Sequence, residues 1–189
     1  VAKGALSVSE RTLFRNLWPM LSPGDVALAD CGFCSYADFH FLSQKGVDCV
    51  MRNHQRRKVG IEPVKTLGKG DRLIKWLKGK PCPKWLAKEQ WAAVPAQLHV
   101  REITFTVDVP GFRSKTLVVV TTLLDARRFP KRAFIELYRR RWMVELFLRD
   151  MKTTMGMEVL RCKTPAMVDK ELAMYLVAYN LVRALLLQA

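Results

Sequence analysis

The sequence predicts an α/β fold with a β-rich segment between two helix-containing parts of the chain. Two short apolar runs of strand length, residues 25–30 and 47–52, alternate with two segments of helical periodicity. Residues 100–123 have the pattern of a β-hairpin, and two long helical segments follow. Helices and strands that alternate along the chain are typical of the α/β class.

The first helix is predicted to begin after Ser9, because serine is a favoured N-cap, and to end at Pro23 and Gly24. The strand 25–30 follows. A second helix is expected from about residue 35 to residue 45, where Gly46 ends it, and a second strand covers 47–52. The order is helix, strand, helix, strand.

Lys and Arg far outnumber Asp and Glu in residues 52–80, and glycines are interspersed. This composition predicts a solvated, loop-rich segment. Trp76 lies among these cations and Trp85 lies shortly after them. This mixture of cations and aromatic residues suits phosphate contacts with some base stacking. An ordinary solvated surface remains the alternative. The residues at its start that we assign to DNA binding are Arg56, Arg57 and Lys58.

A short helix containing Trp85 and Trp91 is expected next. Residues 100–109 then alternate towards a Pro-Gly turn and residues 113–123 return as a β-branched run, which predicts a hairpin. Pro130 opens a helix that runs to about residue 155, and Pro165 opens the last one.

The charge of the chain points to an acidic partner. Its 189 residues carry a formal net charge of +15, and its pI is about 10.0. Such a balance favours binding to nucleic acid over binding to a membrane surface. The most apolar stretch, residues 172–187, is interrupted by Asn180 and Arg183, and no signal-peptide pattern opens the chain. We therefore expect a cytoplasmic protein with no membrane partner.

The five cysteines are irregularly spaced, which favours a reducing compartment over a disulfide framework. Cys31 and Cys34 form a CxxC motif, so a thiol redox protein or half of a zinc site is a competing hypothesis. No second CxxC or HxxxH pair is present to complete a zinc site.

One face of the helix predicted after Pro130 gathers polar residues of functional interest. Arg141, Glu145 and Lys152 follow Tyr138 by three, seven and fourteen residues. At about 100° per residue, the four positions fall within about 60° of one another. Glu145 could instead belong to an ordinary surface ion pair with Arg141, four residues before it.

This spacing, with Trp142 directly after Arg141, resembles the Y-R-E-K signature of insertion-sequence DDE transposases. Residues 28–52, LADCGFCSYADFHFLSQKGVDCVMR, resemble the region around the second catalytic Asp of that family. There, an apolar strand ends in Asp, a turn leads into a helix, and the next strand ends in Arg. The resemblance extends over residues 24–183.

The resemblance implies a fold similar to ribonuclease H, in which three acidic residues hold two Mg²⁺ (or Mn²⁺) ions. Asp30 would be the second catalytic acid and Glu145 the third, and both would bind metal. Hard carboxylate oxygens suit these ions, which activate the attacking oxygen and stabilise the leaving one during phosphodiester displacement. The residues that would contact DNA beside them are Tyr138, Arg141, Trp142 and Lys152.

The implied activity is cleavage and strand transfer at transposon ends, with double-stranded DNA as substrate and target and a homodimer as the DNA-bound state. Residues 1–54 and 124–189 would form the ribonuclease H-like core, and residues 55–123 a basic β-rich insertion.

The chain departs from the family at two points. No Asp precedes Asp25, so the first catalytic acid has no counterpart, and the first strands of the fold are expected upstream. We therefore expect a partial fold that does not cleave DNA alone; a non-catalytic DNA-binding remnant is the alternative. Cys31 also replaces the basic residue that commonly follows the second Asp in the family, which removes one phosphate contact.

Overall fold

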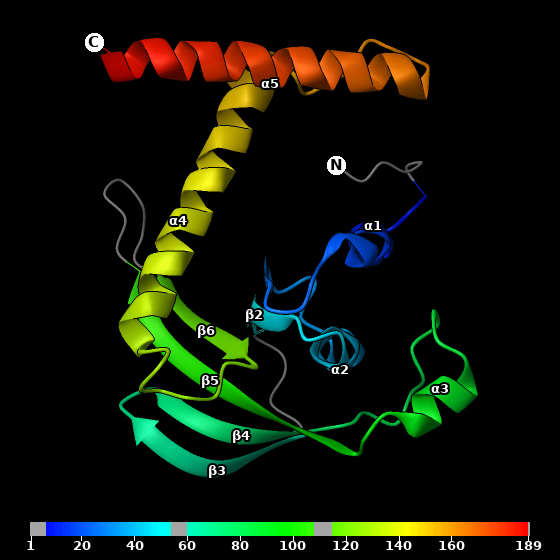
Figure 1. The fold of residues 1–189 in the computed structure, drawn as a ribbon, viewed down its shortest axis with the longest axis vertical. Helices are drawn as coiled ribbons and strands as arrows, with labels where there is room; N and C mark the ends of the chain where they lie inside the picture. Colours follow the sequence, from blue (N-terminus) through cyan, green and yellow to red (C-terminus); the bar gives the residue numbers. More distant parts are fainter. Residues whose placement is uncertain (1–6, 54–59, 108–114, 189) are drawn as a thin grey trace. The chain divides into compact units, whose positions relative to one another are not determined.

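A computed structural model describes residues 7–53, 60–107 and 115–188. The chain divides into two units, Val1–Ile135 and Glu136–Ala189. The first unit contains a six-stranded sheet with the strand order β1-β2-β6-β5-β4-β3 (Figure 1). The second unit is helical.

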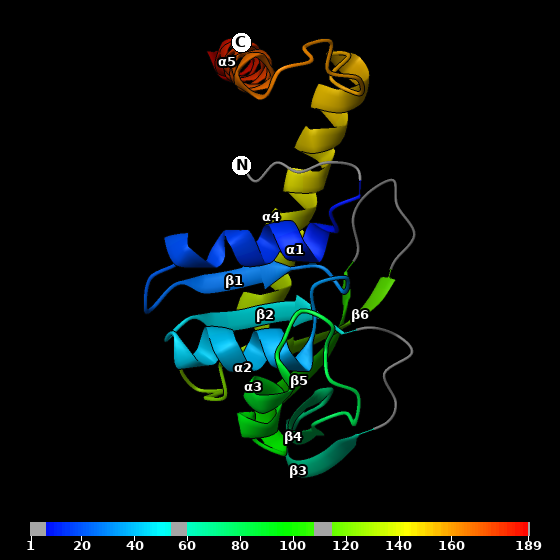
Figure 2. The ribbon, with the colours of Figure 1, turned by 90° about the vertical axis from the view of Figure 1, so that its right-hand side faces the viewer.

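The strand, helix and strand predicted for residues 25–52 are present. β1 (Val26–Ala29) and β2 (Asp48–Arg52) are parallel and pair from Val26 with Asp48 to Ala29 with Met51. Between them, α2 (Tyr36–Gln44) begins after Ser35, whose side chain accepts a hydrogen bond from the Asp38 amide. Figure 2 shows α2 alongside the two strands. This arrangement places the residues that follow β1 and β2 at one edge of the sheet.

The N-terminal helix is shorter than the predicted segment. α1 covers Glu10–Asn16, and a 3-10 turn, η1, follows at Trp18–Met20. Ser9 caps α1 as predicted, because its hydroxyl accepts a hydrogen bond from the Thr12 amide at 3.2 Å.

α2 covers one face of the sheet. Its apolar residues Phe39 and Leu42 are fully buried in a core that includes Cys49 and Met51 of β2. The side chain of Trp76 in β4 joins the same core and packs edge-on against Phe39, with ring centroids 5.2 Å apart. Burial of this apolar area is the main force that fixes α2 against the strands.

Residues 61–77 form a hairpin, so the prediction of a loop-rich segment was wrong there. β3 (Ile61–Gly68) and β4 (Asp71–Leu77) are antiparallel. The period-two pattern of β4 was masked because Arg72 shares the face of Ile74 and Trp76, which point inward and are 1% and 4% exposed, while Lys75 lies on the other face. Trp76 is therefore a core residue and is unavailable for base stacking.

The predicted hairpin is confirmed by β5 (Gln97–Val107) and β6 (Lys115–Thr121), which pair antiparallel. β6 also pairs with β2, and β5 with β4, so the central strands join the two ends of the sheet. The short helix α3 (Lys88–Ala93) precedes β5 and buries Trp91.

The second face of the sheet buries a charged pair. Arg101 of β5 is fully buried and donates two hydrogen bonds to the Asp71 carboxylate, at 2.8 and 2.6 Å. The same guanidinium donates to the Phe129 carbonyl at 2.7 Å and lies 5.3 Å from the ring centroid of Phe134. Arg101 thus fixes the start of α4 (Lys131–Arg149) to the sheet.

The helical unit contains the rest of α4, a five-residue π-helical segment η2 (Asp150–Thr154), and α5 (Pro165–Gln188). The prediction that one α-helix continues to about residue 155 was wrong at its end. A π-helical turn has a wider spacing than an α-helical turn. Lys152 therefore does not hold the angular position that 100° per residue assigned to it.

The mixed α/β architecture confirms the predicted fold class and is compatible with a ribonuclease H-like domain. Among the described residues, no helix is both long enough and apolar enough to cross a membrane.

Candidate catalytic site

Asp30 directly follows β1, and Arg52 is the last residue of β2, so the two side chains meet at the edge where both strands end. Asp30 Oδ1 lies 3.6 Å from Arg52 Nη1. This oxygen is covered from solvent and accepts no hydrogen bond, although the Asp30 side chain as a whole is 41% exposed. A covered carboxylate oxygen without a donor is suited to an incoming cation.

Asn53 follows Arg52 and was not singled out by the sequence. Its backbone amide continues the pairing with β6 by donating to the Val118 carbonyl at 2.7 Å. Its side chain is buried, and Oδ1 accepts no hydrogen bond. A lone Asn after a strand carries no spacing signal, which is why only the fold identifies it as a second unsatisfied oxygen at this edge.

The residues on one face of α4 contact one another as their spacing predicted. Arg141 Nη2 lies 2.7 Å from Glu145 Oε1, and Arg141 Cζ lies 5.5 Å from the ring centroid of Tyr138. Arg141 Nε is buried without a hydrogen-bond acceptor. The Glu145 side chain is 44% exposed, so this ion pair also has the geometry of the simple i to i+4 pair considered above.

Of the remaining predicted site residues, one lies in the π-helical segment and the others lie outside the described part. Lys152 is exposed and belongs to the π-helical segment. Arg56, Arg57 and Lys58 lie outside the described residues, as does the side chain of Trp142.

The donor set agrees with a hard divalent ion only in part. Asp30 belongs to the first unit and Glu145 to the second, and each is described within its own unit. Among the described residues, no group of three or more His, Cys, Asp or Glu side chains could hold a metal ion. Asp30 Oδ1, which accepts no hydrogen bond, fits one position in the coordination shell of Mg²⁺ or Mn²⁺.

The cysteines offer little support for the redox alternative. Cys31 is half-buried and Cys34 is buried, and no disulfide joins them. Cys34 is 2% exposed, and burial raises the pKa of the nearby Cys49 thiol, which disfavours its reactive thiolate form.

The sequence of this chain matches a known protein family. A family model described as a transposase DDE domain matches residues 4–181. The chain belongs to the DDE transposase family. The family's match covers both the region around Asp30 and the Y-R-E-K positions, as the resemblance in the sequence implied.

A curated relative agrees with this membership. The DDE transposase chain is 33% identical over 184 residues to the transposase InsG for insertion sequence element IS4 of Escherichia coli (strain K12). The aligned part is 96% of this chain and 39% of the relative. The chain thus spans about two fifths of the length of the relative that it matches.

Proposed function

We propose that this chain supplies part of the catalytic core of an insertion-sequence transposase that cuts DNA at transposon ends and joins the ends to a target. Asp30 and Glu145 would bind the catalytic ions, Mg²⁺ or Mn²⁺. The observation that carries the proposal is the covered Oδ1 of Asp30, which accepts no hydrogen bond. Asp30 directly follows strand β1 of the sheet. Ligands commonly bind at such carboxyl ends in α/β proteins.

When bound, the ions would lower the pKa of the attacking water or 3′-hydroxyl and stabilise the leaving oxygen. The protein would hold them through carboxylates and would orient the DNA strand through its cations. Arg141 is suited to bidentate contact with a phosphate, because a guanidinium presents paired N–H groups. Lys152 would contribute a point charge. Tyr138 and Trp142 would complete the DNA contacts on α4.

The net charge of +15 supports double-stranded DNA as the substrate, since Lys and Arg neutralise phosphates and release counterions. We also propose that Arg56, Arg57 and Lys58 contact DNA. In this proposal residues 1–54 and 124–189 form the core, and residues 55–123 form an insertion. Two copies would act together on a pair of transposon ends, as a homodimer.

The test separates this proposal from a non-catalytic DNA-binding remnant. Binding of Mn²⁺ to the full chain is measured by electron paramagnetic resonance, in parallel with Asp30→Asn, Glu145→Gln and the control Glu158→Gln. The proposal expects weakened binding in the first two variants and unchanged binding in the control. Identical binding in all four proteins contradicts the metal role of both acids.

DNA affinity is measured on the same proteins at several salt concentrations. Both hypotheses expect affinity to fall steeply with salt, because phosphate contacts dominate it. A chain that binds DNA in this manner, but shows no Mn²⁺ binding that depends on Asp30, is the remnant. A chain that binds neither DNA nor Mn²⁺ contradicts both hypotheses.

A further inference from the structure

The turn after Asp30 has few internal restraints. Within it, the Phe33 amide donates to the Asp30 carbonyl at 3.0 Å, and the Cys34 amide donates to the Cys31 carbonyl at 3.3 Å. Gly32 is exposed, and a Cβ at this position would meet no atom within 4 Å. The position of the Asp30 carboxylate therefore depends on what holds this turn from outside.

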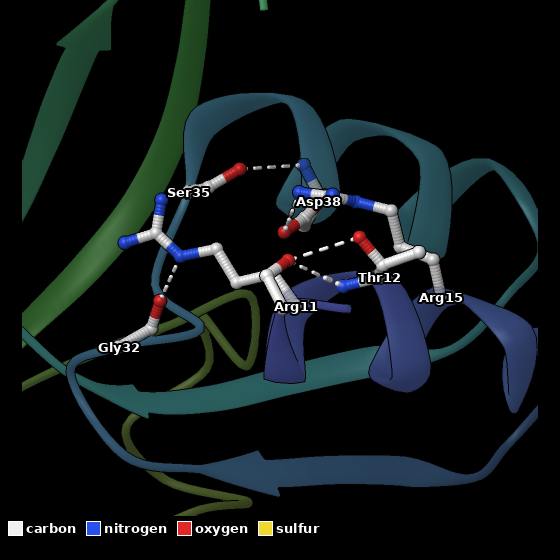
Figure 3. A network of polar contacts seen from close by, with 7 residues as sticks. Arg11, Thr12, Arg15, Gly32, Ser35 and Asp38 are labelled. Carbon is white, nitrogen blue, oxygen red and sulfur yellow. Dashed lines mark hydrogen bonds and ion pairs between the residues drawn. The ribbon is translucent and has the colours of Figure 1, made fainter. Parts of the chain in front are cut away.

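One face of α1 supplies these external contacts (Figure 3). Arg11 Nε donates a hydrogen bond to the Gly32 carbonyl. The ring of Phe14 packs against Phe33, with centroids 5.2 Å apart. Residues three and four positions apart share a helix face, so Arg11, Phe14 and Arg15 lie on the same face of α1.

Arg15 fixes α1 to the first turn of α2. Its guanidinium donates to both oxygens of Asp38, at 2.9 and 3.1 Å, and the Asp38 side chain is fully buried. The guanidinium also lies over the Trp85 ring, with Cζ 4.0 Å from the ring centroid. These contacts leave the Arg15 side chain only 15% exposed, so this cation serves the fold more than any DNA phosphate.

We infer that α1 stabilises the turn that follows Asp30 and that Arg11 is a positioning residue for the Asp30 carboxylate. The ion pair between Arg15 and Asp38 fixes α1 to α2. The hydrogen bond from Arg11 to the Gly32 carbonyl then fixes the turn, two residues beyond Asp30, to α1. This inference rests on the metal role of Asp30 proposed above. Removing a group that orients a metal ligand without itself binding the metal commonly changes the metal affinity.

The test uses Arg11 because its exposed side chain can be changed without leaving a buried charge unpaired. Arg15→Met, in contrast, would leave the buried Asp38 carboxylate without its partner. Three variants of the 189-residue chain are compared with the parent. Arg11→Met removes the hydrogen-bond donor, Arg11→Lys retains one, and Arg127→Met removes an exposed arginine elsewhere in the first unit.

Two readouts report on the turn and on Asp30 separately. The alkylation rate of Cys31, which is half-buried and follows Asp30, is measured by peptide mass spectrometry. The Mn²⁺ dissociation constant is measured by electron paramagnetic resonance, and urea unfolding confirms that each variant is folded. Arg11→Met is expected to raise the Cys31 rate severalfold and to weaken Mn²⁺ binding about tenfold. Arg11→Lys should restore both values, and Arg127→Met should change neither.

Unchanged Mn²⁺ affinity in Arg11→Met overturns the inference, whether or not Cys31 reacts faster. Failure of Arg11→Lys to restore the parent values also overturns it, because the effect would not come from the donated hydrogen bond. If the parent shows no Mn²⁺ binding that Asp30→Asn removes, the proposed function itself fails and the positioning role fails with it.

Discussion

Asp30 Oδ1 faces Arg52 Nη1 at 3.6 Å, across the ends of two parallel strands. The pair is longer than a hydrogen bond, and the same oxygen has no other donor. Arg52 therefore offsets the negative charge of the Asp30 carboxylate without donating a hydrogen bond to Oδ1. The pairing of β1 with β2 produces this relationship, because Ala29 is opposite Met51 and the next residue on each strand is Asp30 or Arg52.

Replacing Arg52 with glutamine is expected to tighten Mn²⁺ binding at Asp30 about threefold. A neighbouring cation opposes a divalent ion, and both side chains are partly solvated, so the gain is modest. Electron paramagnetic resonance of Arg52→Gln checks this, with Lys84→Gln as a control for the loss of one positive charge. Weaker binding in Arg52→Gln would mean that Arg52 supports the site instead of opposing the ion.

Replacing Arg101 with methionine should reduce the free energy of unfolding by about 3–5 kcal/mol, because it leaves the Asp71 carboxylate buried without its partner. Urea titration measures the loss. The double variant Arg101→Met with Asp71→Leu should recover part of it, since no unpaired charge remains. Arg140→Met removes one side of an exposed pair and should cost less than about 1 kcal/mol. Equal losses in Arg101→Met and Arg140→Met would contradict the role given to burial.

Gly70 and Gly24 both have a positive φ, at 66° and 92°, but only Gly70 is tightly enclosed. A Cβ on Gly70 would lie 2.8 Å from the Thr104 carbonyl oxygen, whereas a Cβ on Gly24 would meet no atom within 4 Å. We expect Gly24→Ala to cost about 1 kcal/mol from backbone strain and Gly70→Ala about 3 kcal/mol from strain and overlap. Urea titration of the two variants tests the difference, and a larger loss in Gly24→Ala would refute it.

The Glu171 carboxylate is expected to stabilise the loop before α5 only above acidic pH. Hydrogen bonds from the Arg161 and Cys162 amides, at 2.9 and 3.0 Å, lower the pKa of Glu171 below its ordinary value of 4.5. The stabilisation is therefore complete above pH 4.5 and is lost as the pH falls through the lowered pKa.

Hydrogen-exchange protection of the Arg161 and Cys162 amides, followed with pH, measures this effect. Glu171→Gln should remove the pH dependence of protection, and Glu158→Gln should retain it. Protection in the parent that stays constant down to strongly acidic pH would argue against a contribution from the carboxylate.

Short-range patterns were enough to predict several elements and the position of Asp30 directly after a strand. Ser9 and Ser35 cap their helices through neighbouring amides, so their signals are local. The apolar run before Asp30 identified β1, and the spacing of Tyr138, Arg141 and Glu145 placed them on one helix face. Each of these features depends on residues that are close in the sequence.

The sequence by itself determined the α/β class, the family, and the place of Asp30 directly after a strand. Periodicity and motif spacing depend only on residues that are close together in the sequence. Only the tertiary structure decided that Trp76 enters the core and that Arg101 pairs with Asp71. It also decided that Arg11 reaches Gly32. These contacts join residues about twenty to forty positions apart, and their energy comes from burial and pairing that exist only after the chain has folded.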